Sequence, residues 1–309
     1  MINISQIRQQ KNKIIILGNH EPIIQSILDF DYLSGKKTAS LEAIVTGRSG
    51  YAKYFWGRGE ILVRTLVSFP PDSHGQWVLN LTSGRRTLNS TREALNCRVV
   101  GGALFAENVP ELHALELIKI SQQKQALLVG PASVGLLIPG VLKLGPIGGI
   151  TPDQIFEGHL TEKGSLAVLS ASGGMTNELI NIAVSSGHRL SFALSFGGDR
   201  FPVLSPRDAF LLAESDPETK TILYYGELGG EDEYELVKLK EEGLFTKKVL
   251  AHVAGTVASL FPESPQFGHA KAKADNSRVT AIAKREALKK VGFQVSHSFS
   301  EFISLVSKL

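Results

Sequence analysis

Short apolar runs alternate with amphipathic stretches along the first part of the chain. Residues 13–18 (KIIILG) are typical of a buried strand that ends on a glycine, and residues 23–30 follow with apolar side chains at helical spacing. The same alternation continues, with apolar runs at 76–80, 99–105 and 126–130 and helix-like stretches at 91–95 and 111–120. Strands that alternate with helices predict an α/β fold with a mostly parallel sheet.

A glycine- and proline-rich passage at residues 130–163 interrupts this alternation, and we interpret it as the connection between two domains. A second series follows, with apolar strands at 165–169, 190–196, 221–225 and 248–254 and helical patterns at 175–185, 206–214, 233–243 and 278–291. At about 150 residues per domain, a chain of 309 residues also favours two domains. We therefore predict a first domain at residues 1–160, which includes the connection, and a second at 161–309.

Composition narrows the class of protein. With 43% hydrophobic and 20% charged residues, the chain can bury a core and differs from disordered or fibrous proteins. A single cysteine, Cys97, excludes an internal disulfide, and no apolar stretch approaches the roughly 18 residues that span a bilayer. The start of the chain has no apolar signal-peptide segment. The net charge of +3 is spread without basic, aromatic-rich blocks, so we expect a cytoplasmic protein that binds neither membranes nor nucleic acid.

The turn at residues 170–174 is one candidate for an anion site. Ser172, Gly173 and Gly174 follow a predicted strand and open a predicted helix. The unpaired N–H groups and the dipole of a helix N-terminus suit a phosphate or a carboxylate. A tight turn in which glycine only relieves steric strain explains the same residues equally well.

Glu227 and His269 are two further candidates, and neither stands out by its local context. Glu227 lies in the glycine-rich turn 225–230 after an apolar strand, where a lone carboxylate is more often solvated than catalytic. His269 lies between Gly268 and Ala270, with room for its ring to act as a nucleophile, but it is one of eight histidines. The chain has no Walker-type phosphate loop, no cysteine pair and no His-Glu-x-x-His motif, so we predict no metal site and no nucleotide triphosphate site of these kinds.

Several long motifs, read together, resemble a known family. Four of them occur in an order and spacing similar to the α-type subunit of succinyl-CoA synthetase: SASGGMTNELI at 170–180, SFGGDRFP at 195–202, YYGELGGEDEY at 224–234 and QFGHAKA at 266–272. Others resemble the corresponding module of ATP-citrate lyase and citryl-CoA synthetase: LDFDY at 28–32, YFWGRGEIL at 54–62 and GPASVG at 130–135. The resemblance implies a Rossmann-like CoA-binding domain followed by a flavodoxin-like CoA-ligase domain.

The resemblance also implies the chemistry of an ATP-driven acid–CoA ligase. In that family ATP and the acid give an acyl phosphate, a histidine carries the phosphoryl group, and CoA displaces phosphate. His269 matches the phosphorylated histidine, and Glu227 matches the glutamate that holds the other ring nitrogen. The match at Ser172, Gly173 and Gly174 implies contacts with the acid substrate. A neutral imidazole nitrogen is a competent nucleophile for such a transfer.

Cofactors and partners follow from the same resemblance. Contacts with the cofactor CoA are implied for Gly18, Ser49, Gly50, Lys53, Ser83, Arg85 and Glu107. A solvated basic residue remains the alternative for Lys53 and Arg85. ATP and Mg are expected on a partner, an ATP-grasp subunit of the succinyl-CoA synthetase β type. The expected acid is citrate, and the alternatives are succinate or another carboxylic acid, or a non-catalytic CoA-binding or regulatory subunit.

Two residues beside the implied chemistry depart from the family pattern. Relatives commonly have an arginine at the position of Ala171 and a glycine at that of Lys271. We hypothesise that the ammonium of Lys271 replaces the lost guanidinium as a partner for anions. The chain also ends at Leu309, soon after the end of the synthetase module, which leads us to expect ligation without the cleavage domain of ATP-citrate lyase.

Overall fold

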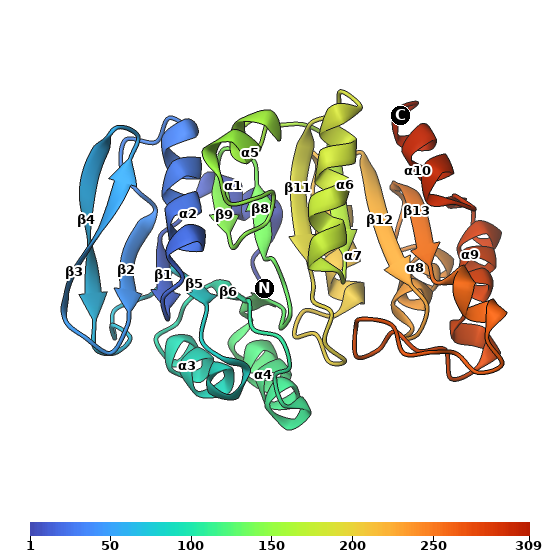
Figure 1. Cartoon of the computed structure of the whole chain (residues 1–309), viewed down its shortest axis with the longest axis horizontal. Helices are drawn as coiled ribbons and strands as arrows, with labels where there is room; N and C mark the ends of the chain where they lie inside the picture. Colours follow the sequence, from blue (N-terminus) through green and yellow to red (C-terminus); the bar gives the residue numbers. More distant parts are fainter.

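The computed structural model describes residues 1–309 and places them in two α/β domains, each built on a seven-stranded sheet (Figure 1). The strand order of the first sheet is β3 (Gly50–Trp56), β4 (Gly59–Leu66), β2 (Leu41–Val45), β1 (Ile14–Leu17), β5 (Trp77–Asn80), β6 (Gly101–Leu104) and β7 (Leu127–Val129). All neighbours are parallel except β3 and β4, which form a hairpin at the edge. The strand order reverses between β1 and β5, and open α/β sheets bind ligands at the carboxyl ends of such strands.

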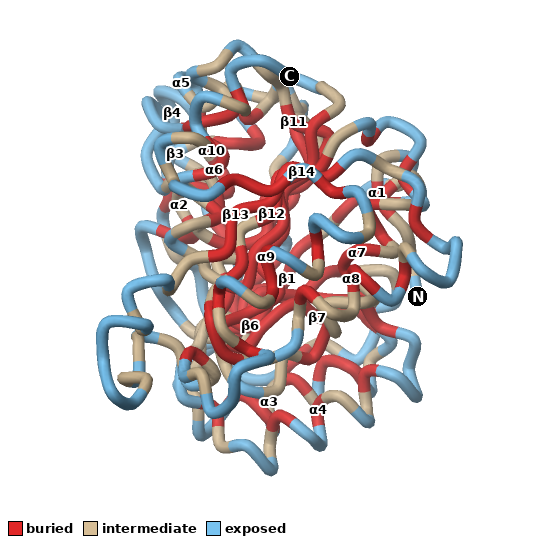
Figure 2. Tube along the Cα trace, turned by 90° about the vertical axis from the view of Figure 1, so that its right-hand side faces the viewer, coloured by how far each residue is buried: buried red, intermediate tan, exposed pale blue.

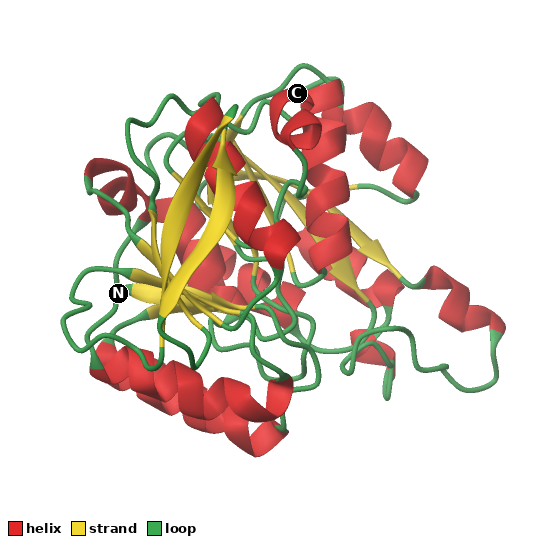
Figure 3. Ribbon diagram, turned by 60° about the vertical axis from the view of Figure 1, so that its left-hand side comes forward, coloured by secondary structure: helices red, strands yellow, loops and turns green.

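Side chains of β1 alternate between helices on the two faces of this sheet. Ile14 and Ile16 pack in one cluster with α2 (Glu21–Leu33). Ile15 and Leu17 pack in another with α3 (Gly84–Asn96) and α4 (Glu111–Lys124). Because both faces are covered, all four residues of the strand are buried, which explains the unbroken apolar run in the sequence. Figure 3 shows helices on both sides of the strands.

The second sheet has the order β14 (Gln294–Val295), β13 (Lys248–Ala254), β12 (Thr221–Glu227), β10 (Leu166–Ser170), β11 (Leu190–Ser195), β8 (Leu136–Ile138) and β9 (Leu142–Leu144). Only the pairs of β8 with β11 and with β9 are antiparallel. Its helices are α5 (Pro152–Glu157), α6 (Gly173–Ser185), α7 (Pro206–Ser215), α8 (Asp232–Glu241), α9 (Ala281–Lys290) and α10 (Phe299–Val306), with 3₁₀ turns at Thr256–Leu260 and Ser277–Val279. The predicted α/β fold class, a Rossmann-like domain followed by a second α/β domain on a mostly parallel sheet, is confirmed.

Two parts of the sheets differ from the prediction. The passage 130–163, predicted to be a connection, contains β8 and β9, and these strands extend the second sheet. The change from one sheet to the other therefore lies between Val129 and Leu136, before the predicted boundary at residue 160. Strands of three residues have too short a pattern to be recognised locally; β8 is stabilised here by pairing with β11, and β9 by pairing with β8. No element is predicted at 41–66, where β2 and the more exposed strands β3 and β4 lie.

The two domains share one core. A single cluster of 46 buried apolar residues includes side chains of α1 (Ile4–Gln9), β1, β8 and β12. In Figure 2 the buried parts of the trace run through the centre of the molecule and along the strands. Arg8 of α1 reaches the second domain, where its guanidinium donates to the carboxylate of Asp216 and to the carbonyl of Ser191. None of the helices has the length and apolar character needed to cross a membrane.

Candidate functional site

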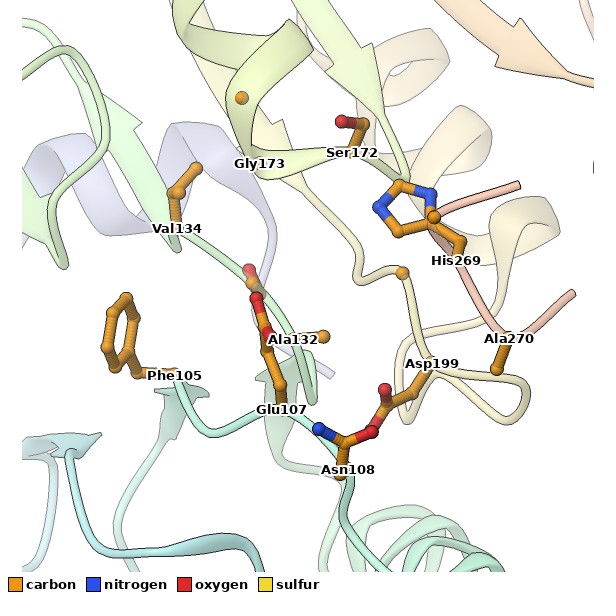
Figure 4. Close-up of a pocket in the computed structure, with 14 residues that line it drawn as sticks. Phe105, Glu107, Asn108, Ala132, Val134, Ser172, Gly173, Asp199, His269 and Ala270 are labelled. Carbon is orange, nitrogen blue, oxygen red and sulfur yellow. The ribbon is translucent and has the colours of Figure 1, made fainter. Parts of the chain in front are cut away.

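A cavity of about 350 Å³ opens where loops from the carboxyl ends of both sheets meet (Figure 4). The first domain contributes the loop after β6, with Phe105, Glu107 and Asn108. The connection between the two sheets contributes residues 132–134, and the second domain contributes three segments, at 172–174, 198–199 and 268–270. The predicted residues His269, Ser172, Gly173, Gly174 and Glu107 all line this cavity. The structure thus brings residues from both domains into one site.

The N-terminus of α6 forms one wall of the cavity. The Ser172 hydroxyl caps the helix by accepting from the N–H of Met175 at 3.3 Å, and the N–H of Ser172 itself donates to Ser170 Oγ at 3.0 Å. The N–H groups of Gly173 and Gly174 belong to the first turn, which has no intrahelical acceptors. A Cβ atom at Gly173 would come within 2.6 Å of the Val134 side chain. This wall is therefore a turn of free donors at the positive end of a 13-residue helix, which suits a carboxylate or phosphate.

His269 is oriented by Glu227, which lies at the end of β12. Nδ1 of the imidazole lies 2.7 Å from Oε1 and 2.9 Å from Oε2 of that carboxylate. This bond raises the pKa of His269, and partial burial of the ring opposes the effect only in part. Because Nδ1 donates to the carboxylate, the lone pair of the neutral ring is on Nε2, which makes no hydrogen bond to the protein. The pair has the geometry of an oriented nucleophile.

Two glycines allow the His269 segment to approach the rest of the site. A Cβ atom at Gly198 would lie 2.6 Å from Cδ2 and 2.7 Å from Nε2 of His269. A Cβ atom at Gly229, where φ is +79°, would lie 2.0 Å from the carbonyl oxygen of Lys271. Any other residue at either position would displace the histidine loop.

The ammonium of Lys271, which we hypothesised to replace the lost guanidinium, has a partner within the chain. Its ammonium pairs with the Asp232 carboxylate and lies 5.5 Å from the centre of the Phe196 ring. The side chain is 7% exposed and does not line the cavity. Its charge lowers the pKa of His269, against the larger effect of Glu227. The lost arginine is therefore not replaced by a free ammonium, because the charge of Lys271 is already paired. Ala171 itself is buried.

The residues predicted to contact CoA follow the carboxyl edge of the first sheet, except Lys53. Gly18 follows β1, Ser49 and Gly50 follow β2, Ser83 and Arg85 follow β5, and Glu107 follows β6. Of these only Glu107 lines the cavity. Lys53 lies inside the edge strand β3, where its exposed ammonium pairs with Glu60 at 3.3 Å.

The turns after β1 and β5 have backbone features that suit a phosphate group. Gly18 has a φ of +92°, and a Cβ atom there would lie 3.2 Å from the backbone of Leu81. Ser83 is the N-cap of α3, yet its hydroxyl makes no capping bond, so the first N–H groups of this 13-residue helix lack a side-chain acceptor. A phosphate group of CoA would satisfy these donors.

Asp199 is a cavity residue that the sequence analysis did not single out. Its carboxylate accepts from the N–H of Val109 at 3.2 Å and so joins the second domain to the first beside the cavity. Burial raises the pKa of Asp199, against the opposing effect of the N–H groups of Val109 and Asn108. The motif SFGGDRFP contains Asp199, but only the tertiary contact indicates a role. No group of three or more His, Cys, Asp or Glu side chains is arranged to hold a metal ion.

Comparisons with known proteins identify relatives over nearly the whole chain. Residues 169–293 match the family model described as CoA-ligase. The ATP-citrate synthase subunit 1 of Sordaria macrospora is 33% identical over 97% of this chain and 45% of its own length. The ATP-citrate synthase of Mus musculus is 36% identical over 96% of this chain and 28% of its own length. The chain therefore spans less than half of these relatives.

Solved structures show the same relationship. The ATP citrate lyase of Methanosaeta concilii, a D541A mutant in complex with (3S)-citryl-CoA, has a TM-score of 0.90 and 34% identity, over 96% of this chain and 49% of that chain. The lyase of Methanothrix soehngenii in complex with citrate and coenzyme A has the same TM-score, identity and coverage. A dinucleotide-forming acetyl-coenzyme A synthetase of Ca. Korarchaeum cryptofilum, at 16% identity and a TM-score of 0.69, shares the fold alone.

Proposed function

Because this chain carries a CoA-ligase domain and is homologous to ATP-citrate synthases over nearly its full length, we propose that it forms citryl-CoA from citrate and CoA through phosphorylated His269. One observation carries the proposal. Glu227 holds Nδ1 of His269 at 2.7 Å, and the ring lines the same cavity as the free donors at the start of α6. A nucleophile and an anion site thus face one space that is shared by both domains.

Phosphorylation of His269 is the first step of the proposed reaction. The Nε2 lone pair attacks the γ-phosphorus of ATP, an N–P bond forms, and the bond to the bridging oxygen breaks to release ADP. Glu227 stabilises the positive charge that develops on the ring, because its carboxylate accepts from Nδ1–H. This chain shows no phosphate loop for the triphosphate, so we assign ATP and Mg to an ATP-grasp partner subunit.

Two further transfers complete the proposed reaction. A carboxylate oxygen of citrate takes the phosphoryl group from Nε2, which gives citryl phosphate, and the N–P bond breaks. The thiolate of CoA then attacks the acyl carbon and releases phosphate. Ser172, Gly173 and Gly174 hold the acid by their N–H and hydroxyl groups, and the positive end of α6 stabilises the charge that passes through the cavity.

CoA approaches from the first domain in this proposal. Its phosphates bind at the turns of Gly18 and Ser83, and the thiol end reaches the cavity beside Glu107. Ser49, Gly50 and Arg85 lie on the same carboxyl edge and complete the binding surface. Lys53 contributes only if its ion pair with Glu60 opens. We place the resulting hetero-oligomer in the cytoplasm.

Labelling with ATP tests this function. The chain is mixed with its ATP-grasp partner and ATP radiolabelled in the γ-phosphate, and acid-labile, base-stable phosphate on the chain is measured. We expect wild-type protein to be labelled and His269→Asn to remain unlabelled. An assembled complex without label would instead support the non-catalytic CoA-binding or regulatory subunit, the alternative that the loss of the arginine at Ala171 motivates.

The acid is tested on the labelled protein. Citrate with CoA should discharge the phosphohistidine and produce citryl-CoA, and succinate should discharge it at least tenfold more slowly. Faster discharge by succinate would show that succinate, and not citrate, is the substrate. The proposed phosphohistidine chemistry would still hold.

A further inference from the structure

A buried ion pair lies directly behind the turn that carries Glu227. Nζ of Lys284, on α9, lies 2.6 Å from Oε2 of Glu233, on α8, and both side chains are 1% exposed. The hydroxyl of Tyr224, on β12, donates to the other carboxylate oxygen of Glu233 at 3.1 Å. The steps of the proposed reaction make no use of these three residues. A charged pair in the core requires compensating contacts, so its surroundings indicate its purpose.

The Lys284 ammonium binds the backbone on both sides of Leu228. It donates to the carbonyl oxygen of Glu227 at 2.7 Å and to the carbonyl oxygen of Gly229. These two carbonyl groups lie in the turn that connects β12 to α8. The ammonium therefore donates to two carbonyl groups of the turn that presents the Glu227 carboxylate to His269, and its charge is paired with Glu233.

Glu233 supports the same turn from the other side. A Cβ atom at Gly226 would lie 1.9 Å from Oε1 of Glu233, so the carboxylate packs directly against the backbone before Glu227. This contact explains why glycine precedes Glu227 in the sequence. Between them, Glu233 and Lys284 contact Gly226, immediately before Glu227, and the carbonyl groups of Glu227 and Gly229.

We propose that Lys284 and Glu233 are positioning residues that fix the Glu227 carboxylate on Nδ1 of His269. This inference rests on the proposed phosphohistidine function and adds to it the residues that hold the orienting carboxylate. Without the Lys284 contacts, the carbonyl groups of the turn lose their donor, and the carboxylate no longer has one fixed distance to the imidazole.

Arg285 provides a matched control on the same helix. Its guanidinium is also largely buried and also binds backbone carbonyl groups, those of Val253 at the end of β13 and of His297. It makes no hydrogen bond to the turn of Glu227. Loss of Arg285 therefore disturbs the packing of α9 without removing the donors to that turn.

The experiment measures the pKa of His269 in the isolated full-length chain by NMR of labelled imidazole groups, with His269→Asn to assign the signal. The charged groups that act on the ring are Glu227, Lys271, Glu107 and, across the cavity, Asp199. Glu227→Gln defines the result when the orienting carboxylate is lost, and it should lower the pKa of His269, because burial of the ring and the charge of Lys271 then act without the opposing carboxylate. The test variant combines Lys284→Met with Glu233→Gln, so that no unpaired charge remains in the core.

We expect the double variant to lower the pKa of His269 at least half as far as Glu227→Gln does, and to slow labelling of His269 by about tenfold to a hundredfold. Arg285→Met should leave the pKa of His269 unchanged even where it lowers the melting temperature. A folded double variant with the wild-type pKa would overturn the proposal. If the double variant does not fold, the single variant Glu233→Gln provides the test. We then expect a smaller decrease in the pKa of His269, and an unchanged pKa would count against the proposal. The NMR titration needs neither ATP nor a partner, so its outcome is independent of whether the wild type is labelled.

Discussion

The imidazole of His269 and the backbone of Gly198 are in direct contact, which leaves no room for even a methyl group. A Cβ atom there would lie 2.6 Å from Cδ2 of the ring, closer than carbon atoms in proteins approach. Because Glu227 holds the opposite side of the imidazole at Nδ1, the ring cannot retreat without losing that bond. A side chain larger than hydrogen at position 198 would therefore displace the His269 ring from Glu227.

We expect Gly198→Ala to slow labelling of His269 at least tenfold, because the ring must move away from Glu227. The measurement is the rate of phosphate incorporation from labelled ATP in the assembled complex. Gly59→Ala is the control, since its Cβ atom would meet nothing closer than a carbonyl oxygen at 3.8 Å in the β3–β4 turn. Equal labelling rates for the two variants would show that His269 does not need this close approach.

At the scale of elements, α6 and α7 begin in the same way but at different places. Ser172 caps α6 at the cavity, and Ser205 caps α7 outside it, accepting from the N–H of Asp208 at 3.1 Å. A capping hydroxyl contributes about 1 kcal/mol to the free energy of unfolding in either helix. Only the α6 cap also faces the proposed acid substrate.

We therefore expect Ser172→Ala and Ser205→Ala to lower the free energy of unfolding by a similar amount, about 1 kcal/mol each, in urea denaturation. Ser172→Ala should in addition slow the discharge of the phosphohistidine by citrate, by about fivefold to tenfold, because a lost hydrogen bond contributes about 1 kcal/mol. Ser205→Ala should discharge at the wild-type rate. If both variants discharge like the wild type, the start of α6 does not hold the acid.

At the scale of the whole molecule, the ion pair of Arg8 with Asp216 connects the first domain to the second. The Arg8 side chain is 7% exposed and that of Asp216 is fully buried, with two parallel contacts of 2.5 and 3.0 Å. Burial by itself raises the pKa of Asp216, but the bonds from Arg8 and Thr219 outweigh it, so the net shift is downward. A lowered pKa means that the pair stabilises the fold above the ordinary value of about 3.9 and loses this contribution as the pH falls through the folded-state value.

We expect Arg8→Met to lower the free energy of unfolding by about 3–5 kcal/mol at pH 7, because Asp216 remains as an unpaired buried carboxylate. Arg8→Met combined with Asp216→Leu should recover most of the loss. The difference between wild type and Arg8→Met should also shrink when denaturation is repeated at progressively lower pH, below about 4. A difference that is constant with pH would mean that the ion pair is not its source.

Much of the fold follows from the sequence because local patterns report burial. Residues 14–17 and 166–169 are apolar at every position, since parallel strands covered by helices on both faces have no solvent-facing side. The same reasoning does not identify β8 and β9, because strands of three residues carry too few positions to show a period. β8 belongs to the second sheet because it pairs with β11, much later in the chain, and β9 belongs to it because it pairs with β8.

The sequence by itself determined the longer buried strands and most of the helices, and the ordered motifs identified His269, Glu227 and Ser172 as the residues to consider. Only the tertiary structure decided how these residues are arranged, because their contacts join segments that are far apart in the chain. Glu227 and His269 are 42 residues apart, and Lys284 reaches the Glu227 carbonyl across 57. Lys271 shows the same limit, since its sequence position indicates a free charge near the histidine, whereas folding brings Asp232 beside it and pairs that charge. A local pattern reports whether a side chain is buried, but its partner is set by how the sheets and loops pack.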